Sequence, residues 1–467
     1  MKKILFTILA LNSLTLSAFC MSFDEAKNLV SKTGIGVSIK DIENIKDLEI
    51  NNAINKIISN SNSELEVKPP NWVNDINIQE KKEFTEEQRK EYREKLNQQA
   101  KELKMWWYKE MIKTDSPLTE HLTLFWHNHF TSGYKKVRSP KLMFNQNQIF
   151  RKNALGNFKT LLHEISKDPA MIIYLDNQQN RKEKPNENFA REVLELFTIG
   201  EGNYKEKDIK ESARAFTGWK VNNKTGEFFF NKKTYDDKNK TFFGKTGKFN
   251  GDDILNIILE QPKTSEFITK KFWKEFISDT PNKDEVKRIA NIFKNSNYEI
   301  KVLMKEILTS PFFNKKENYG NIIKSPVELI AGTFRLLNIP FEENDKNIEQ
   351  IIKYSEKLGQ DIFDPPNVKG WEGGTAWINS DSLTTRQQLL KRLTSGMEIF
   401  SREYQEKHTD FLPNKNIYSL WVDDNKNNYE SIKNYIYPFN PINKIDDNLN
   451  KTMFVRKAIL DPVYQLK

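Results

Sequence analysis

Apolar residues recur every three to four positions through most of the chain, which is the period of amphipathic α-helices. Short polar turns separate the periodic segments. The pattern predicts helices over 140–152, 155–166, 169–178, 186–198, 205–217, 252–260, 263–277, 282–295, 299–309, 325–337, 347–358 and 382–399. We therefore expect a mainly α protein, with one large multi-helix domain over residues 24–400.

Two regions depart from the helical pattern. In GEFFFNKKTYDDKNKTFFG, the apolar runs 228–230 and 241–243 flank a polar turn and predict at most one small β-hairpin. After about residue 400 the periodicity thins, and aromatic residues are scattered among polar ones. We expect residues 401–467 to form a C-terminal extension packed on the helical core.

Two predicted helices differ sharply in their polarity. The helix that begins after Phe84 is highly charged at first and becomes apolar only near Met105, so its first half should be solvated and its second half buried. The next helix, in LTEHLTLFWHNHF (118–130), has no polar face, which is typical of a fully buried helix. Ser116 and Pro117 provide a cap and a first turn.

Aromatic residues supply much of the apolar content, with 31 Phe, 15 Tyr and 9 Trp in 467 residues, enough for a sizeable core. The net charge is +9, from 73 basic and 64 acidic residues. The two signs are interspersed and no arginine-rich block occurs. We therefore expect no nucleic-acid partner.

The N-terminus has the layout of a secretory signal peptide over residues 1–20: two lysines, an apolar run over 4–18, then small residues. Cleavage is expected after Ala18 or after Cys20, and the mature protein would be periplasmic or secreted. No later apolar run is long enough for a transmembrane segment. If Cys20 is removed, the mature chain has no cysteine, which excludes disulfides and thiolate chemistry.

The stretch FWHNHF, with the nearby His121, concentrates three of the five histidines of the chain. On an α-helix, His127 and His129 point about 200° apart, so they converge only if the helix ends near Asn128. Three interpretations stay open: metal ligands, a catalytic or ligand-polarising pair, or structural histidines whose hydrogen bonds are satisfied inside the protein.

The stretch KPNENFAREVLELFTIG, residues 184–200, predicts an amphipathic helix that ends at Gly200. Its polar arc carries Glu187, Arg191, Glu192 and neighbouring polar residues. One interpretation is a solvated face with weak ion pairs along the helix. The other is an acidic wall of a cleft, in which Arg191 sets the charge state of the carboxylates.

The stretch FDPPNVKGWEGGTAWINS, residues 363–380, predicts a rigid loop, because it combines two prolines, three glycines and two tryptophans. Such loops often shape binding sites, and a purely structural loop is the alternative. No glycine in it follows a strand and precedes a helix, so a nucleotide-binding loop is not expected.

Taken in order, FWHNHF, DPAMIIYLDNQQNRKEKPNENFAREVLELFTIG and FDPPNVKGWEGG resemble the bacterial family known as domain of unknown function 1800, over about residues 80–395. The resemblance implies a mostly helical, exported protein whose gene neighbour encodes a phosphatase- or sulfatase-like partner. It places the family's motif residues at His127, Asn128, His129, Asp168, Asp176, Asn177, Asn186, Glu187, Asn188, Arg191, Glu192, Trp219, Asp364, Asn367 and Trp371. Family members often carry a histidine near the predicted hairpin, where this chain reads TYDDKNKT, so a site that needs it would be incomplete here.

The resemblance raises the expectation that the histidine stretch and the acidic stretch meet in one pocket. Candidate catalytic residues are His127, His129, Glu187, Arg191 and Glu192. Candidate ligand-binding residues are Asn128, Asn186, Asn188, Asp176, Asn177, Trp219, Asp364, Asn367 and Trp371. No metal or cofactor is identified.

Three functions compete. The favoured one is an envelope binding or accessory protein that holds a sugar or a peptide. The alternatives are a hydrolase, metal-dependent or not, that uses the histidine and glutamate candidates, and a buried polar network with a purely structural role.

Overall fold

The computed structural model describes residues 20–75, 84–339, 346–395, 428–446 and 448–467. The predicted signal peptide up to residue 19 and the start of the C-terminal extension lie outside this range. In chain order the helices are α1 (Phe23–Thr33), α2 (Ile39–Glu43), α3 (Ile50–Asn60), α4 (Glu86–Lys113), α5 (Pro117–His129), α6 (Tyr134–Val137), α7 (Pro140–Lys152), α8 (Phe158–Ser166), α9 (Pro169–Tyr174), α10 (Asn188–Glu192), the π-helical turn η4 (Val193–Thr198), α11 (Glu206–Ala215), α12 (Gly251–Glu260), α13 (Pro262–Phe276), α14 (Lys283–Asn295), α15 (Ile300–Leu308), α16 (Pro326–Leu337), α17 (Lys346–Lys357), α18 (Ser380–Ser395), α21 (Tyr429–Ile436) and α22 (Lys451–Ala458).

The prediction of a mainly α protein is confirmed. The helices begin close to the expected residues because many of them start at a capping residue that can be recognised in the sequence. The side chain of Asn250 accepts the backbone N–H of Asp253 at the start of α12. Ser325 and Glu328 form the reciprocal capping box of α16. Among the helices in the described parts of the chain, none combines the length and apolar content needed to span a bilayer.

The predicted pairing of the β-strands is wrong. Strand β2 (Phe228–Phe230) pairs with the preceding β1 (Trp219–Val221), and β3 (Lys240–Phe242) pairs with the following β4 (Lys245–Gly247). Each pairing is local. Phe243 and Gly244 both have positive φ, as a two-residue hairpin turn requires. The expected partners therefore sit in two separate two-stranded sheets.

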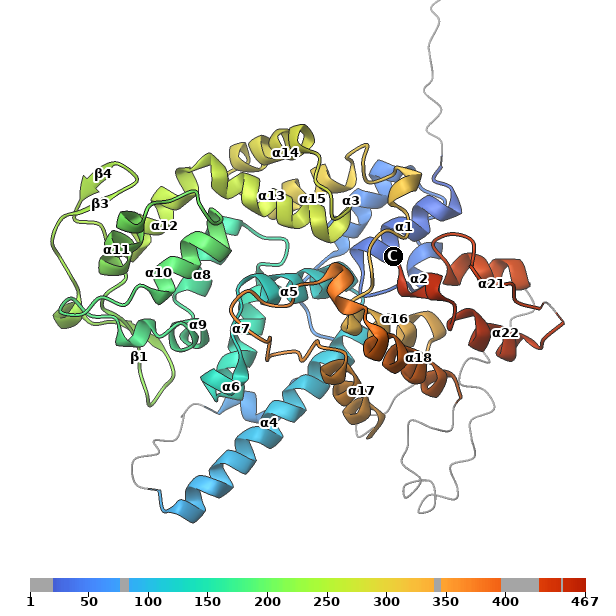
Figure 1. The fold of residues 1–467 in the computed structure, drawn as a ribbon, viewed down its shortest axis with the longest axis horizontal. Coiled ribbons are helices and arrows are strands. Elements are labelled where there is room, and N and C mark those ends of the chain that lie inside the picture. The colour runs from blue at the N-terminus through green and yellow to red at the C-terminus, as the bar shows by residue number, and fades with distance from the viewer. Residues whose placement is uncertain (1–19, 76–83, 340–345, 396–427, 447) are drawn as a thin grey trace, which may run out of the picture.

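Helix α5 lies in the middle of the molecule, with α7 and α13 nearby (Figure 1). All but two of its residues are buried, as the absence of a polar face predicts. Its Phe125 and Trp126 belong to an apolar cluster formed mainly by α1, α3, α8 and α10–α15. Its Leu124 belongs to a second cluster formed by α4, α16–α18 and the C-terminal helices. Helix α5 therefore joins the two halves of the core.

A buried ion pair fixes α5 against α4 and α7. Arg151 of α7 donates to both carboxylate oxygens of Glu120 on α5, at 2.6 and 2.8 Å, and the two side chains are 1% and 2% exposed. The indole N–H of Trp107 on α4 donates to the same carboxylate at 2.8 Å. The guanidinium also donates to Asn147. The carboxylate that helix α5 carries into the core at Glu120 is therefore paired.

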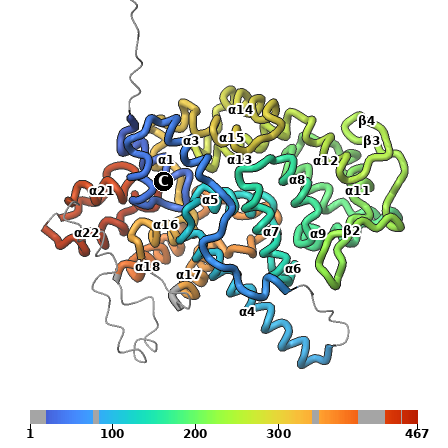
Figure 2. Tube along the Cα trace, turned by 180° about the vertical axis from the view of Figure 1, so that it is seen from behind, coloured from blue at the N-terminus to red at the C-terminus, as the bar shows by residue number. Residues whose placement is uncertain are grey.

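Helix α4 is divided as predicted. From Leu103 onward it is mostly buried, whereas residues 86–99 are exposed or partly exposed. Figure 1 shows this N-terminal half projecting away from the body of the protein. The described C-terminal helices pack beside α1, as Figure 2 shows from behind. Lys27 of α1 donates to the carbonyls of Asn434 and Tyr437, and Leu466 forms a β-bridge with Ile323.

Candidate functional site

A pocket of about 560 Å³ lies beside α5, and we call it the α5 pocket. Its walls come from five parts of the chain: α5, α13 with the residues after it, the segment 322–328, the loop 360–377, and Lys467. Polar and charged side chains line it together with aromatic ones. Those used below are His121, Asn128, His129, Lys271, Glu275, Asp279, Glu328, Trp371, Trp377 and Lys467.

One wall of the α5 pocket is a network of charged side chains around His121. The Nε2 of His121 donates to Glu275 at 2.7 Å and lies 3.9 Å from Glu328. The ammonium of Lys467 donates to Glu328 and lies 3.8 Å from Glu275. Burial alone would raise the pKa of both glutamates, but His121 and Lys467 hold them below the ordinary range. Both glutamates are therefore carboxylates at neutral pH.

His121, Glu275 and Glu328 also form the one histidine and carboxylate group, among the described residues, whose atoms could coordinate a metal ion. Imidazole and carboxylate ligands suit zinc, manganese or iron. In this structure the ammonium of Lys467 contacts both carboxylates and offsets one of their two negative charges.

His129 lines another part of the α5 pocket with its protonation fixed. Its Nε2 donates to the carbonyl of Phe197 at 3.0 Å, which leaves Nδ1 as an acceptor. Burial and then the charge of Lys271 lower the pKa of His129 well below its ordinary value, so the ring is neutral. Nδ1 is buried and has no hydrogen-bond partner among the described residues.

The loop 363–377 is held against α5 through its backbone. The side-chain amide of Asn128 accepts the N–H of Trp371 at 2.7 Å and donates to its carbonyl at 3.3 Å. One residue earlier, Gly370 has a φ of +79°, and a side chain there would overlap Asn128. The indole N–H of Trp371, which lines the α5 pocket, is buried without a partner in the described part of the chain.

His127 has a structural contact on the other side of α5. Its Nε2 accepts the backbone N–H of Phe363 at 3.2 Å, and the ring packs among Trp107, Phe363 and Trp371. Burial lowers its pKa to about 3, so it stays neutral. Because α5 continues to His129, the two rings diverge as the helical geometry requires, and His127 does not line the α5 pocket.

The acidic stretch contacts the histidine stretch only in part. The carbonyl of Phe197 meets His129, but Glu187 and Arg191 lie on a partly exposed face. Arg191 pairs with Glu187 at 3.4 Å and with Glu206 at 3.0 Å. None of Glu187, Arg191 and Glu192 lines the α5 pocket. Burial, followed by the charge of Glu195, raises the pKa of Glu192.

Four amide and carboxylate candidates form a separate network that holds backbone. Asn177 donates to the carbonyl of Phe216, and Asn188 to that of Leu175. Asn186 accepts the N–H of Asn188 and donates to the carbonyl of Asp176. The carboxylate of Asp176 accepts the ammonium of Lys136 at 2.7 Å. These contacts order the turn that leads into α10.

The remaining candidates also have local partners. Trp219 is 3% exposed and packs on Phe216 and Phe189. Asp364 accepts the backbone N–H of Lys135 at 3.2 Å and its ammonium at 2.7 Å. Asn367 accepts the N–H of Lys369 and closes a turn. Of all the predicted residues, the α5 pocket collects Asn128, His129 and Trp371.

Sequence reasoning missed most charged residues of the α5 pocket, among them Lys271, Glu275, Glu328 and Lys467. Lys271 and Glu275 lie on α13, whose charged positions look like an ordinary solvated face. Glu328 is the N3 residue of a capping box, and that local role already explains a glutamate at this position. The one available signal was His121, a histidine on a helix with no polar face, because such a group needs a charged or hydrogen-bonding partner from elsewhere.

Two buried lysines behind the α5 pocket predict a pH dependence of stability. Burial lowers the pKa of Lys324 from 10.5 to about 7. Burial, with a smaller effect of the charge of Lys467, does the same for Lys32. Between pH 7 and pH 10.5 these two lysines are protonated in the unfolded chain but largely neutral in the folded one. The free energy of unfolding therefore rises with pH over that interval. The gain is up to about 1.4 kcal/mol per pH unit for each lysine.

Urea unfolding between pH 7 and 9.5 checks this prediction. The free energy of unfolding should increase over that interval, and Lys324→Met should flatten part of the increase. A wild-type stability that is constant or falls over the same interval would contradict the assignment of these two pKa values.

A family model described as "Protein of unknown function (DUF1800)" matches residues 28–459. No curated protein and no solved structure matches the chain.

Proposed function

The chain belongs to the DUF1800 family, and from this premise we propose that it binds a small sugar or peptide in the α5 pocket. One observation supports the proposal most: five separate parts of the chain bring aromatic and charged groups to one pocket of about 560 Å³. That volume lies within the range of small-molecule sites.

The chemistry of the lining supports a polar ligand. Trp371 and Trp377 offer aromatic surface of the kind that stacks on sugar rings. Lys271 and Asp279 offer opposite charges, and neither has an ion-pair partner among the described residues. His129 and Trp371, which each carry a buried nitrogen without a partner among the described residues, belong to the same lining. A ligand with hydroxyl, amide and carboxylate groups would match these side chains.

A binding role is preferred to the hydrolase alternative because the predicted catalytic histidines are occupied. The Nε2 atoms of His127 and His129 are both engaged with backbone groups, and both rings are neutral. Burial with no charged partner makes His127 a poor general base. Glu187 and Arg191 lie outside the α5 pocket.

The cellular setting of this role is also a proposal. The signal-like N-terminus supports export to the periplasm or beyond, and the family resemblance suggests a phosphatase- or sulfatase-like envelope protein as a partner. Fractionation of cells that express the full chain tests the first point. Co-purification of that partner from the periplasmic fraction tests the second.

Titration with muramyl dipeptide, which joins an acetylated sugar to a short peptide, tests ligand binding in the α5 pocket. We expect a saturable change in tryptophan fluorescence, since two tryptophans line the pocket. Lys271→Met should weaken binding at least tenfold, because it removes an ammonium that lines the pocket and has no ion-pair partner among the described residues. Lys270→Met, which changes an exposed lysine on the same helix outside the pocket, should leave affinity within twofold.

Titration with the sugar alone and the dipeptide alone identifies which half is recognised. Mass spectrometry of the probe after incubation separates binding from hydrolysis, since a binding protein returns it intact. No saturable signal, or equal affinities of the Lys271→Met and wild-type proteins, would refute the proposal.

A further inference from the structure

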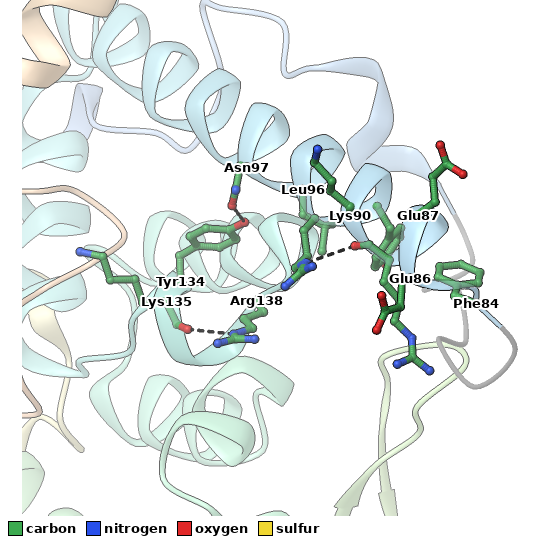
Figure 3. A pocket seen from close by; sticks show the side chains of 12 residues that line it. Phe84, Glu86, Glu87, Lys90, Leu96, Asn97, Tyr134, Lys135 and Arg138 are labelled. Atoms are coloured by element: carbon green, nitrogen blue, oxygen red, sulfur yellow. Dashed lines mark hydrogen bonds between the residues drawn. The ribbon is translucent and has the colours of Figure 1, made fainter.

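The projecting half of α4 faces α6 across a second pocket, which we call the α4 pocket (Figure 3). It encloses about 1190 Å³ and is separate from the α5 pocket, with which it shares no residue. The phenol of Tyr134 on α6 donates to Asn97 on α4 at 3.0 Å and ties the two walls together. Because α4 continues into the core, the projecting wall is anchored at one end.

Basic side chains dominate this lining. The five cations are Arg89, Lys90, Arg93, Lys135 and Arg138, and the two acids are Glu86 and Glu87. Arg89 and Arg93 are one helical turn apart, where like charges destabilise a helix. Neither arginine forms an ion pair with the described residues, so an anion bound between them would offset their like charges.

The guanidinium groups of Arg93 and Arg138 are each oriented by one hydrogen bond, and their other N–H groups have no partner among the described residues. The Nε of Arg93 donates to the carbonyl of Arg89 at 3.2 Å, and the Nε of Arg138 donates to that of Lys135 at 3.3 Å. Both contacts use the inner nitrogen, so the two terminal amino groups stay available. A guanidinium presented in this way forms paired hydrogen bonds with a carboxylate, sulfate or phosphate.

Aromatic rings stand among these cations. Phe84 packs edge to face on Tyr92 with ring centres 5.5 Å apart, and Tyr134 lies on the opposite wall (Figure 3). Rings placed beside cations suit a ligand that alternates apolar ring faces with anionic groups. A chain of acidic sugars has that alternation.

We propose that the α4 pocket binds an acidic polysaccharide, with Arg89, Arg93 and Arg138 holding its anionic groups and Tyr92 and Tyr134 contacting its rings. An acidic peptide fits less well, because both walls are helical and offer no strand edge for backbone pairing. A membrane surface fits less well too, since this half of α4 lacks the continuous apolar face of an interfacial helix. The proposal is independent of the ligand of the α5 pocket.

Fluorescence anisotropy with labelled decagalacturonate tests the proposal on the full chain. We expect saturable binding that weakens as salt is added. The double variant Arg89→Gln, Arg93→Gln should bind at least tenfold more weakly. The matched control is Lys283→Gln, Lys287→Gln, which removes two exposed charges one turn apart on α14, and it should stay within twofold of wild type.

Equal weakening by both double variants would overturn the proposal, because net charge alone would then explain binding. So would absence of binding, or equal affinity for an uncharged dextran of the same length. Tighter binding to deca-glutamate, to decathymidylate or to phosphatidylglycerol vesicles would overturn it in favour of that partner. Lys271→Met should bind decagalacturonate like wild type, so failure here and failure at the α5 pocket can be told apart.

Discussion

Replacing Arg151 with methionine is expected to lower the free energy of unfolding by about 3–5 kcal/mol. The change removes the only cation that contacts Glu120 among the described residues, and that carboxylate is 2% exposed. Burial already raises the pKa of the neighbouring Glu110 to about 6, with the charge of Glu120 adding to the effect. An unpaired Glu120 would place a bare charge in the same apolar surroundings.

Urea unfolding followed by circular dichroism measures the loss. The control is Arg288→Met on α14, because Arg288 makes the same two-pronged contact with Glu285, at 2.9 Å for each bond, but is 45% exposed. Exposed pairs are worth about 0–1 kcal/mol. The buried change should therefore cost several times more than the exposed one.

Removing both partners of the buried pair separates two explanations. The double variant Glu120→Leu, Arg151→Met leaves no bare charge, so it should recover part of the stability lost in Arg151→Met. If the double variant is less stable than the single one, the pair contributes through packing and its hydrogen bonds to Trp107 and Asn147 rather than through charge.

The second large effect is expected from Gly370→Ala. An added Cβ would lie 2.2 Å from the side-chain oxygen of Asn128 and 2.6 Å from its carbonyl oxygen. Those distances are far inside van der Waals contact, so Asn128 must release Trp371. We expect a loss of about 3–5 kcal/mol, from left-handed strain together with overpacking, and a weaker response to muramyl dipeptide.

Gly373→Ala separates the effect of backbone strain from the effect of the overlap with Asn128. Gly373 has a φ of +78°, close to the +79° of Gly370, but an added Cβ would meet nothing within 4 Å. Its ψ of −173° lies in a region that glycine occupies almost alone, so the strain by itself should cost about 1–3 kcal/mol. Thermal unfolding monitored by tryptophan fluorescence compares the two variants. Equal losses would mean that the contact between Asn128 and the loop contributes little.

The helices could be predicted from sequence because their information is local. A periodic apolar stripe and a cap fixed α12, α14 and α16 to within a few residues. The burial of α5 also followed from its lack of a polar face. Strand pairing could not be predicted in the same way, because the apolar runs at 228–230 and 241–243 are compatible with more than one partner. The positive φ at Phe243 and Gly244 decides the β3–β4 turn.

The α5 pocket could be predicted only in part from the sequence, because its residues come from separate elements. His129, Asn128 and Trp371 stood out as polar or aromatic residues in unusual positions. Glu275 and Lys271 did not, since an exposed charge and a pocket-lining charge look alike on an amphipathic helix. Glu328 and Lys467 are 139 positions apart in the chain, and no local pattern relates their charges.

The π-helical turn η4 has a consequence for how this protein can vary. A π turn winds one residue more than an α turn, and here that turn ends with the Phe197 carbonyl aimed at His129. Deleting one residue between positions 193 and 198 would rotate that carbonyl away by about 100°. The imidazole would then lose its anchor and its fixed tautomer. An insertion or deletion in this segment should therefore be tolerated only together with a replacement at position 129.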